Sequence, residues 1–367
     1  ATLAQPGTDD RIEKMVTMRC LVREALLLTC MLTLCQSGDT PVGHLEPFGG
    51  WKPGTPVLER DDVPSPWEFY RDYAQVDKGR GVPVIFRGAA KGMAATKNWE
   101  NDESFLKMHG NAKIEGVEYN LKETREGGQV PGMKTLQDFL KAYNKSDIYM
   151  VSKVPKALAK DIDFLPCLNC GHYLSFLDVA NLWMGRGGSK SVIHYDDQDN
   201  INCMISGSKR FVFMHPSYKK KFEAHPNTKK NQFGWVDTDL DNNVPGYGAF
   251  FGRLDIDKMD LVKYPGWSTV DWSYADLAAG DCLYIPYQWY HQVTAAPVRS
   301  INVHIWYWRP SKMTEASCNE TTSPPPTLAD CSWGYEPPEG GHVGRAKDKG
   351  KTSCSKKKKS SSAAAEL

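Results

Sequence analysis

Three side chains of this sequence have the types and the spacing of a metal-ligand set: His194, Asp196 and His291. Residues i and i+2 of a β-strand project from one face, so a strand here would aim His194 and Asp196 at the same point. Residues 191–195 are rich in β-branched and aromatic types, as strands are. A chain with nine histidines contains such a pair by chance, so the pair needs support from elsewhere. Two imidazoles and one carboxylate favour non-haem Fe(II) over zinc.

A lysine follows this pair at an informative position. Residues 200–205 and 209–214 are two apolar-rich runs separated by Ser-Gly-Ser at 206–208, which predicts a hairpin with glycine at its turn. Lys209 would then begin the returning strand. It either keeps its ammonium in water at the strand end or points into the fold. In the second case it needs an anionic partner, because an unpaired buried ammonium is very costly.

The second histidine, His291, follows a distinctive run at 280–286. Gly-Asp opens a turn, a short apolar strand follows, and a proline ends that strand. A lone histidine in an aromatic strand is more often a hydrogen-bonded core residue than a ligand. The preceding run favours a ligand in this case.

Residues 191–209 and 280–306 together resemble the Jumonji-C (cupin-8) 2-oxoglutarate oxygenases, and the small hydroxylases among them more than the large multidomain histone demethylases. The likeness extends over roughly residues 51–310. Further matching runs flank the two segments, at 64–73, 82–89, 181–185 and 264–267. The resemblance implies a mainly β fold with flanking helices (α+β), whose core is a double-stranded β-helix, or jelly roll, of about eight antiparallel strands.

By this resemblance, His194, Asp196 and His291 would ligate Fe(II). Lys209, fifteen residues after His194, would pair with the distal carboxylate of 2-oxoglutarate. Ser191, three residues before His194, stands where the family has a serine or threonine that contacts the same carboxylate.

Two further residues correspond to the co-substrate site, and one departs from the family pattern. Asn200, six residues after His194, stands where the family has an asparagine lining that site, and Tyr149 matches a tyrosine that reaches the co-substrate. His304 departs from the pattern, since an asparaginyl hydroxylase among these small hydroxylases has an asparagine near the metal there. It either faces the site or fills space.

The activity implied is a 2-oxoglutarate-dependent dioxygenase that uses Fe(II) and O₂ and hydroxylates an amino-acid side chain of a protein substrate. The alternatives are a non-catalytic protein that keeps the fold as an interaction module, a demethylase, and an RNA-base hydroxylase. All three metal-ligand positions and the lysine position keep the residue types of the family, which argues against a non-catalytic protein. A net charge of +1 argues against nucleic acid as a partner, because phosphate binding needs a concentrated basic face.

Length and composition indicate one sizeable folded domain. Hydrophobic residues make up 41% of the 367 residues. We expect a single oxygenase domain over 38–310, with its core at about 145–310. Helices are expected at Ser65–Tyr73, at Thr135–Tyr143 with an N-cap pattern at its start, and at Leu177–Trp183. Residues 218–272, rich in Asp, Asn, Gly and Pro, are expected to form an insert near the mouth of the barrel.

The N-terminus has the anatomy of a secretory signal peptide. Arginines at 19 and 23 precede an apolar run at 25–35, and small residues follow it. We expect residues 1–37 to be an upstream extension and signal, with Met15 or Met18 as initiator and the mature chain beginning near Gly38. The run is too short to span a bilayer comfortably, so we expect no membrane span in the mature chain. An amphipathic or buried helix is the alternative.

Other features agree with an oxidising compartment. Of the ten cysteines, those at 20, 30 and 35 precede residue 38, so seven follow it. Cys318 and Cys331 bracket a proline-rich loop and are candidates to pair. The C-x-x-C at 167–170 is either a disulfide loop or two ordinary thiols. Asn144 and Asn319 begin N-glycosylation triplets.

The last segment, 311–367, is expected to be a largely disordered tail rich in proline, serine and lysine. Its run of four lysines at 356–359 is either solvated filler or a nuclear or nucleic-acid address. The signal predicts the secretory pathway and the lumen of the endoplasmic reticulum. The alternative is the nucleus or the cytoplasm.

Overall fold

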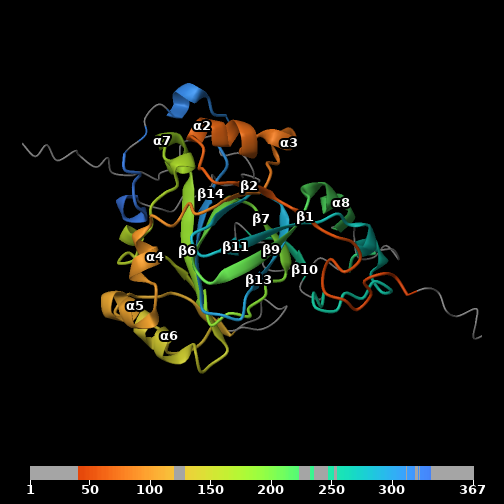
Figure 1. Cartoon of the computed structure of the whole chain (residues 1–367), viewed down its shortest axis with the longest axis horizontal. Coiled ribbons are helices and arrows are strands. Elements are labelled where there is room, and N and C mark those ends of the chain that lie inside the picture. The colour runs from red at the N-terminus through yellow and green to blue at the C-terminus, as the bar shows by residue number, and fades with distance from the viewer. Residues whose placement is uncertain are drawn as a thin grey trace, which may run out of the picture.

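The computed structural model of the chain describes residues 40–119, 129–222, 232–234, 254–310, 312–318, 321 and 323–331, together with the backbone of 247–251. In this part of the chain two β-sheets pack face to face (Figure 1). The larger sheet has eight strands in the order β2-β3-β12-β8-β14-β6-β5-β4, and the smaller has six in the order β1-β11-β9-β13-β7-β10. This is the jelly-roll core that the sequence predicts. The expected signal and the lysine run lie outside the described residues.

The strands of the larger sheet are β2 (Leu58–Arg60), β3 (Val84–Phe86), β4 (Val117–Tyr119), β5 (Ile148–Lys153), β6 (Leu177–Gly185), β8 (Asp199–Ser206), β12 (Cys282–Ile285) and β14 (Ser300–Tyr307). Those of the smaller sheet are β1 (Thr55–Pro56), β7 (Ile193–Asp196), β9 (Ser208–Met214), β10 (Tyr247–Phe251), β11 (Ser273–Ala278) and β13 (Tyr290–Ala295).

Short helices surround the sheets. The α-helices are α2 (Pro66–Phe69), α3 (Val76–Gly79), α4 (Ala94–Asn98), α5 (Asp102–His109), α6 (Leu136–Ala142), α7 (Gly171–Leu174) and α8 (Lys219–Phe222). The single-turn helices are a π-helix at Tyr70–Ala74 and 3₁₀-helices at Ala159–Asp161, Pro166–Leu168, Pro216–Tyr218, Pro265–Thr269, Glu315–Cys318 and Leu328–Asp330. In the view of Figure 1, helices α4 to α6 lie on the side of β6, and α8 lies on the opposite side. No helix among the described residues is long and apolar enough to cross a membrane.

Two of the three predicted helices are confirmed. Ser65 caps α2 through a capping box with Glu68, and the π-helical turn continues this helix to Ala74. Thr135 caps α6 through a second capping box with Asp138, as its sequence pattern predicts.

The third predicted helix, Leu177–Trp183, is wrong: this segment is strand β6. Its apolar residues fit a helical period, but β6 pairs along its length with β14 and β5. The pairing produces a period of two, with Ala180 and Leu182 buried on the outer face of the sheet while Asn181 and Trp183 point inward. Tertiary pairing therefore overrides the local pattern.

The predicted hairpin at 200–214 is also wrong. Its strands, β8 and β9, are consecutive but belong to different sheets, because β8 pairs with β12 and β14 whereas β9 pairs with β11 and β13. Gly207 forms the corner between the sheets with a φ of 79°, and a Cβ there would lie 2.4 Å from the carbonyl oxygen of Arg299. The glycine therefore permits a change of sheet rather than a hairpin turn.

The core has an outer and an inner part. The outer face of the larger sheet packs against α4, α5 and α6 through fully buried rings such as Trp99, Phe105 and Phe139. Between the sheets, one end of the barrel is filled by apolar side chains, among them Met204 and Phe211. Polar side chains occupy the rest of the interior, which is where the candidate site lies.

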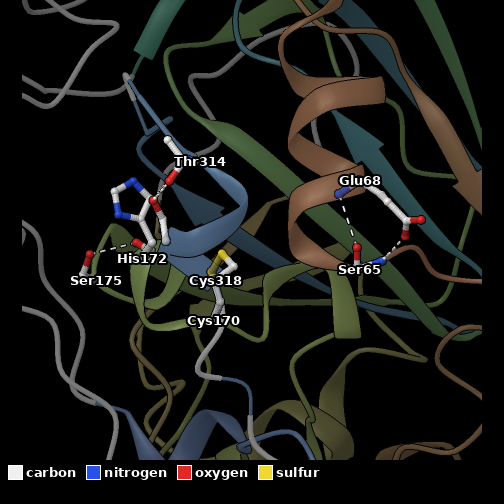
Figure 2. The surroundings of a disulfide bond; sticks show 8 residues. Ser65, Glu68, Cys170, His172, Ser175, Thr314 and Cys318 are labelled. Carbon is white, nitrogen blue, oxygen red and sulfur yellow. Dashed lines mark hydrogen bonds between the residues drawn. A yellow bond between two sulfur atoms is a disulfide. The ribbon is translucent and has the colours of Figure 1, made fainter.

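The sequence predicts a disordered tail from residue 311, but the folded domain continues beyond this residue. Met313, Cys318 and Leu328 are buried in the outer core, and Thr327 forms a β-bridge with Asp163. Cys318 is bonded to Cys170, not to Cys331 (Figure 2). The folded domain therefore includes the described residues between 312 and 331, which carry enough apolar side chains to be held in the core.

The two cysteines of the C-x-x-C at 167–170 neither pair with each other nor remain two free thiols. Cys170 bonds to a distant cysteine, whereas Cys167 is a buried free thiol. A second disulfide joins Cys203 to Cys282 across strands β8 and β12. Sequence spacing does not reveal either pairing, since both join positions far apart in the chain.

Candidate metal centre and co-substrate pocket

The three candidate metal ligands meet at one point between the sheets. Strands β7 and β13 pair with His194 opposite His291, and Asp196 lies two residues further along β7. One nitrogen or oxygen atom of each side chain lies within 4.8 Å of those of the other two. The Nε2 atom of His291 is 3.9 Å from Oδ2 of Asp196. The fold therefore presents two imidazoles and one carboxylate to a single site.

Hydrogen bonds orient the two imidazoles for metal binding. Nδ1 of His194 lies 2.8 Å from the carbonyl oxygen of Val192, and Nδ1 of His291 lies 2.9 Å from that of Trp289. A carbonyl only accepts, so each Nδ1 carries the proton and each Nε2 presents a lone pair. The indole of Trp306 donates to Oδ2 of Asp196 at 3.2 Å, which orients the carboxylate.

Lys209 points into the barrel, which settles the alternatives that its sequence leaves open. Its side chain is buried, and Nζ donates to the hydroxyl of Tyr149 at 2.9 Å and to Oδ1 of Asn302 at 2.5 Å. Among the described residues it has no carboxylate partner. Burial lowers the pKa of Lys209 to about 7. A bound anion would restore the charge of this ammonium.

The spacing between Lys209 and the ligands suits a small dicarboxylate. Strand β9 lies beside β13, with Phe213 opposite His291 and Lys209 opposite Ala295. Four residues of strand separate the two positions, which is roughly 13 Å. A lysine side chain and a short chelating acid together span such a distance. Burial also raises the pKa of Tyr149, so its hydroxyl stays protonated and able to donate.

Strand β14 supplies a row of polar residues facing the interior. Asn302 bridges Lys209 to Asn202, donating through Nδ2 to Oδ1 of Asn202 at 3.1 Å. His304 is buried, and its Nδ1 is 2.7 Å from Nδ2 of Asn200. Burial, reinforced by the neighbouring basic groups of Lys209 and His291, holds the pKa of His304 well below its usual value. His304 therefore faces the site as a neutral imidazole instead of filling space in the apolar core.

Several buried polar atoms in this interior lack a hydrogen-bond partner among the described residues. They belong to side chains on the inner faces of β6 and β8: Asn181 Oδ1, Trp183 Nε1, Asn200 Oδ1 and Asn202 Nδ2. Buried polar groups are almost always hydrogen-bonded, so a cluster of buried polar atoms without such partners indicates a site for a polar ligand. Donors and acceptors are both present, as recognition of carboxylate and carbonyl oxygens and of bound water requires. The residues present therefore fit a metal ion with a small polar co-substrate.

Ser191 is placed differently from the other predicted residues. Its hydroxyl accepts from the amide of Val293 at 2.9 Å and donates to the carbonyl of Val192 at 3.1 Å. These bonds tie the start of β7 to β13. Within the described residues no hydrogen bond joins Ser191 to Lys209, so its role toward a carboxylate stays a prediction.

Sequence reasoning missed Asn302, Asn202, Asn181 and Trp183. Their signal was available as alternation: β6 reads Asn181-x-Trp183, β8 reads Asn200-x-Asn202 and β14 reads Asn302-x-His304-x-Trp306. Polar residues at a period of two on buried strands mark a wet face inside a barrel.

Comparison with known proteins agrees with this fold and site. The family model described as "Cupin-like domain" matches residues 68–313, that is 246 of 367 residues. The chain therefore belongs to the cupin-like family.

Similar proteins carry Jumonji-C names. The human "Bifunctional peptidase and (3S)-lysyl hydroxylase JMJD7" is 24% identical over 277 residues, covering 67% of this chain and 82% of the relative. JmjC domain-containing protein E of Dictyostelium discoideum is 22% identical, covering 68% and 83%. Jumonji C domain-containing protein 5 of Drosophila melanogaster is 31% identical over 129 residues, covering only 34% and 26%. Fold, ligand set and relatives support an iron- and 2-oxoglutarate-dependent oxygenase as the general class.

Proposed function

We propose that this protein is an Fe(II)- and 2-oxoglutarate-dependent oxygenase that hydroxylates an amino-acid side chain of a protein. The observation that carries the proposal is one barrel interior holding both His194, Asp196 and His291 and a buried Lys209 without a carboxylate partner among the described residues. An iron ion with 2-oxoglutarate would supply oxygen activation, coupled to the conversion of 2-oxoglutarate to succinate and CO₂.

The chain's own residues would bind and orient the reactants. The Nε2 atoms of His194 and His291 and the carboxylate of Asp196 would hold the metal on one side and leave its other positions open. Lys209 and Tyr149 would bind the distal carboxylate of the co-substrate in the interior between the sheets. This fixes the co-substrate in one orientation, and fixed orientation is a large part of catalysis in such sites.

The side chains around this pocket would exclude water. Trp183 and Trp306 pack against His304 with ring centroids 5.4 and 4.9 Å apart, which closes the interior beside β14. The partnerless amides of Asn200 and Asn202 would bond to the co-substrate or to its bound water. Polar groups held in fixed positions away from bulk water strengthen each of these contacts.

A protein substrate is supported by the relatives and by the surroundings of the metal centre. The human relative is named as a lysyl hydroxylase, and the zebrafish relative "Lysine-specific demethylase 8" is 27% identical over 129 residues. Strand β10, from the segment at 218–272 that is rich in Asp, Asn, Gly and Pro, pairs with β7 at His194 and Asp196. An insert beside the metal is where substrate selection usually resides.

The test is incubation of the purified protein with candidate substrate proteins, Fe(II), 2-oxoglutarate and O₂, followed by mass spectrometry. Hydroxylation predicts a gain of one oxygen atom that disappears in Asp196→Ala. Loss of a methyl group from a methylated lysine would assign the demethylase alternative instead. No modification and no succinate with any substrate would contradict both.

We also propose that the protein matures in the secretory pathway, in the lumen of the endoplasmic reticulum. Two disulfides, Cys170–Cys318 and Cys203–Cys282, support an oxidising compartment. Asn144 is exposed after α6, as a glycan acceptor must be. N-terminal sequencing of protein from animal cells should find a chain beginning near Gly38. An uncleaved, reduced protein in the nucleus or cytoplasm would contradict this placement.

A further inference from the structure

A buried ion pair lies at the start of β8, next to the candidate co-substrate residue Asn200. Arg309 donates to Asp199 through Nε at 2.7 Å and through Nη2 at 2.5 Å, and the two side chains are 6% and 1% exposed. The hydroxyl of Tyr284 donates to Oδ1 of Asp199 at 3.0 Å and accepts from Nη2 of Arg309 at 3.0 Å. Every polar atom of this carboxylate is thus engaged by a fixed donor.

The same carboxylate holds the turn that leads into the metal ligand His291. The amide of Tyr287 donates to Oδ1 of Asp199 at 2.8 Å. The next amide, that of Gln288, donates to the backbone carbonyl of Asp196 at 3.0 Å. Gln288 has a φ of 61°, a conformation that a non-glycine residue keeps only where its surroundings enforce it. Two consecutive amides of this turn are therefore fixed to the segment 196–199, which carries one of the other ligands.

The opposite side of the turn is held by the loop at 79–81. Arg309 donates to the carbonyls of Gly79 and Arg80, and the indole of Trp289 donates to the carbonyl of Gly81 at 3.1 Å. Gly81 has a φ of 76°, and a Cβ there would lie 3.0 Å from Pro286 and 3.2 Å from the guanidinium of Arg309. The arginine therefore connects three parts of the chain that are distant in sequence, namely β8, strand β12 and the loop at 79–81, and two of these, β8 and the loop, bond directly to the ligand-bearing turn.

A buried ion pair is not in itself an efficient source of stability. Removing two charges from water costs about as much as their attraction returns, and apolar residues of similar size often stabilise a protein as well. The special property of this pair is its geometry. A planar guanidinium binding a carboxylate through two nitrogens fixes both groups in a way that lysine does not reproduce.

We propose that Asp199 and Arg309 are positioning residues of the metal centre. They hold the turn at 286–290 so that the imidazole of His291 meets His194 and Asp196 at ligand distance. The inference rests on the proposed function, because it assigns the pair a role toward a metal bound by those three residues. Neither residue is one of the proposed metal ligands or co-substrate contacts; Asp199 acts through a backbone amide of the turn, and Arg309 acts through Asp199 and the loop at 79–81.

The test uses Co(II) as a probe ion, because its visible absorption reports the geometry of its ligands. The purified wild-type protein and Asp199→Asn are titrated with Co(II) without 2-oxoglutarate, and thermal unfolding is recorded for each. We expect Asp199→Asn to bind Co(II) about 10–100-fold more weakly, the usual effect of losing a residue that orients a metal ligand. We also expect an altered absorption spectrum for the ion that still binds.

The matched control is Asp161→Asn, which removes a comparable buried carboxylate among the helices. Asp161 is 3% exposed and is bonded to His109 at 2.9 Å and to the indole of Trp99 at 2.9 Å. This variant should lose stability as well, yet bind Co(II) with wild-type affinity and spectrum. If Asp199→Asn does not fold, Tyr284→Phe replaces it, since it keeps both charges and removes one bond to each; several-fold weaker binding is then expected.

The possible outcomes separate the two proposals. Wild-type affinity and spectrum in Asp199→Asn, or in Tyr284→Phe where that replaces it, would overturn the positioning role and leave the oxygenase assignment standing. Equal weakening in Asp161→Asn would also overturn it, since the effect would then follow stability alone. A wild-type protein that binds no Co(II) would overturn the proposed function and this inference together.

Discussion

Relative to the wild type, replacement of Lys209 by methionine should stabilise the ligand-free protein against unfolding and destabilise its complex with 2-oxoglutarate. The side chain is buried against the neutral groups of Tyr149 and Asn302. The drop in the pKa of Lys209 from its usual 10.5 to about 7 corresponds to roughly 5 kcal/mol of unfavourable burial for the charged form. The two hydrogen bonds offset part of this cost. We therefore expect Lys209→Met to raise the free energy of unfolding of the empty protein by about 1–3 kcal/mol at pH 7.

The lowered pKa of Lys209 determines how the free energy of unfolding changes with pH. Between pH 7 and 10.5 the unfolded chain holds a proton on this lysine that the folded protein lacks. The free energy of unfolding of the wild type therefore rises with pH over that window. Lys209→Met lacks this contribution, so its advantage should be largest below pH 7 and should shrink as the pH approaches 10.5.

The co-substrate should reverse the order of stability. A buried charge pair that loses one partner typically costs about 2–5 kcal/mol, so Lys209→Met should bind 2-oxoglutarate roughly 30-fold to several thousand-fold more weakly. The assay is urea unfolding across pH, with and without 2-oxoglutarate and a redox-inert divalent metal. An empty variant less stable than the wild type, or equal stabilisation of both by 2-oxoglutarate, would refute the reasoning.

Three further predictions test other parts of the account. Asp196→Ala should abolish 2-oxoglutarate turnover in an assay of succinate while the circular dichroism spectrum is retained, because the residue serves a catalytic metal; retained turnover would remove it from the ligand set. Leu328→Ala should lower the free energy of unfolding by about 2–5 kcal/mol in urea, since this side chain is fully buried; no change would place the segment around residue 328 outside the fold. Asn144→Gln should remove one glycosidase-sensitive mobility shift from protein secreted or retained by animal cells, and an identical shift would exclude a glycan at this position.

The candidate site was largely predictable because its residues are constrained by local spacing. The period of two on a strand aims His194 and Asp196 at one point, and their resemblance to a known order of ligands adds His291 and Lys209. These features need no knowledge of which strands pair. The clustering of His194, Asp196 and His291 is accordingly where the sequence pattern and the geometry agree most closely, and their role as metal ligands stays a prediction.

Features that depend on distant pairing were not predictable in the same way. The glycine between β8 and β9 reads locally as a hairpin turn, yet the strands separate into two sheets because each finds its partners far along the chain. The apolar spacing of β6 fits a helix until β14 and β5 pair with it. Cys170 and Cys318 are 148 residues apart, so only the fold brings them together.

The polar residues of the barrel interior were only partly predictable from the sequence. Alternating asparagines on β8 and β14 are visible in the sequence, but their meaning depends on knowing that both strands face the same interior. The Asp199–Arg309 pair is beyond local reasoning altogether, since 110 residues separate its members. Its connection to the turn before His291 appears only in three dimensions.

The most direct test of the central claim is the metal-dependent conversion of 2-oxoglutarate to succinate by the purified protein. Wild-type protein with Fe(II) and O₂ should form succinate, with a substrate protein increasing the rate. Addition of a chelator, or the substitution Asp196→Ala, should abolish it. Succinate formation that is equal with and without Fe(II), or equal in wild type and Asp196→Ala, would contradict an oxygenase centred on His194, Asp196 and His291.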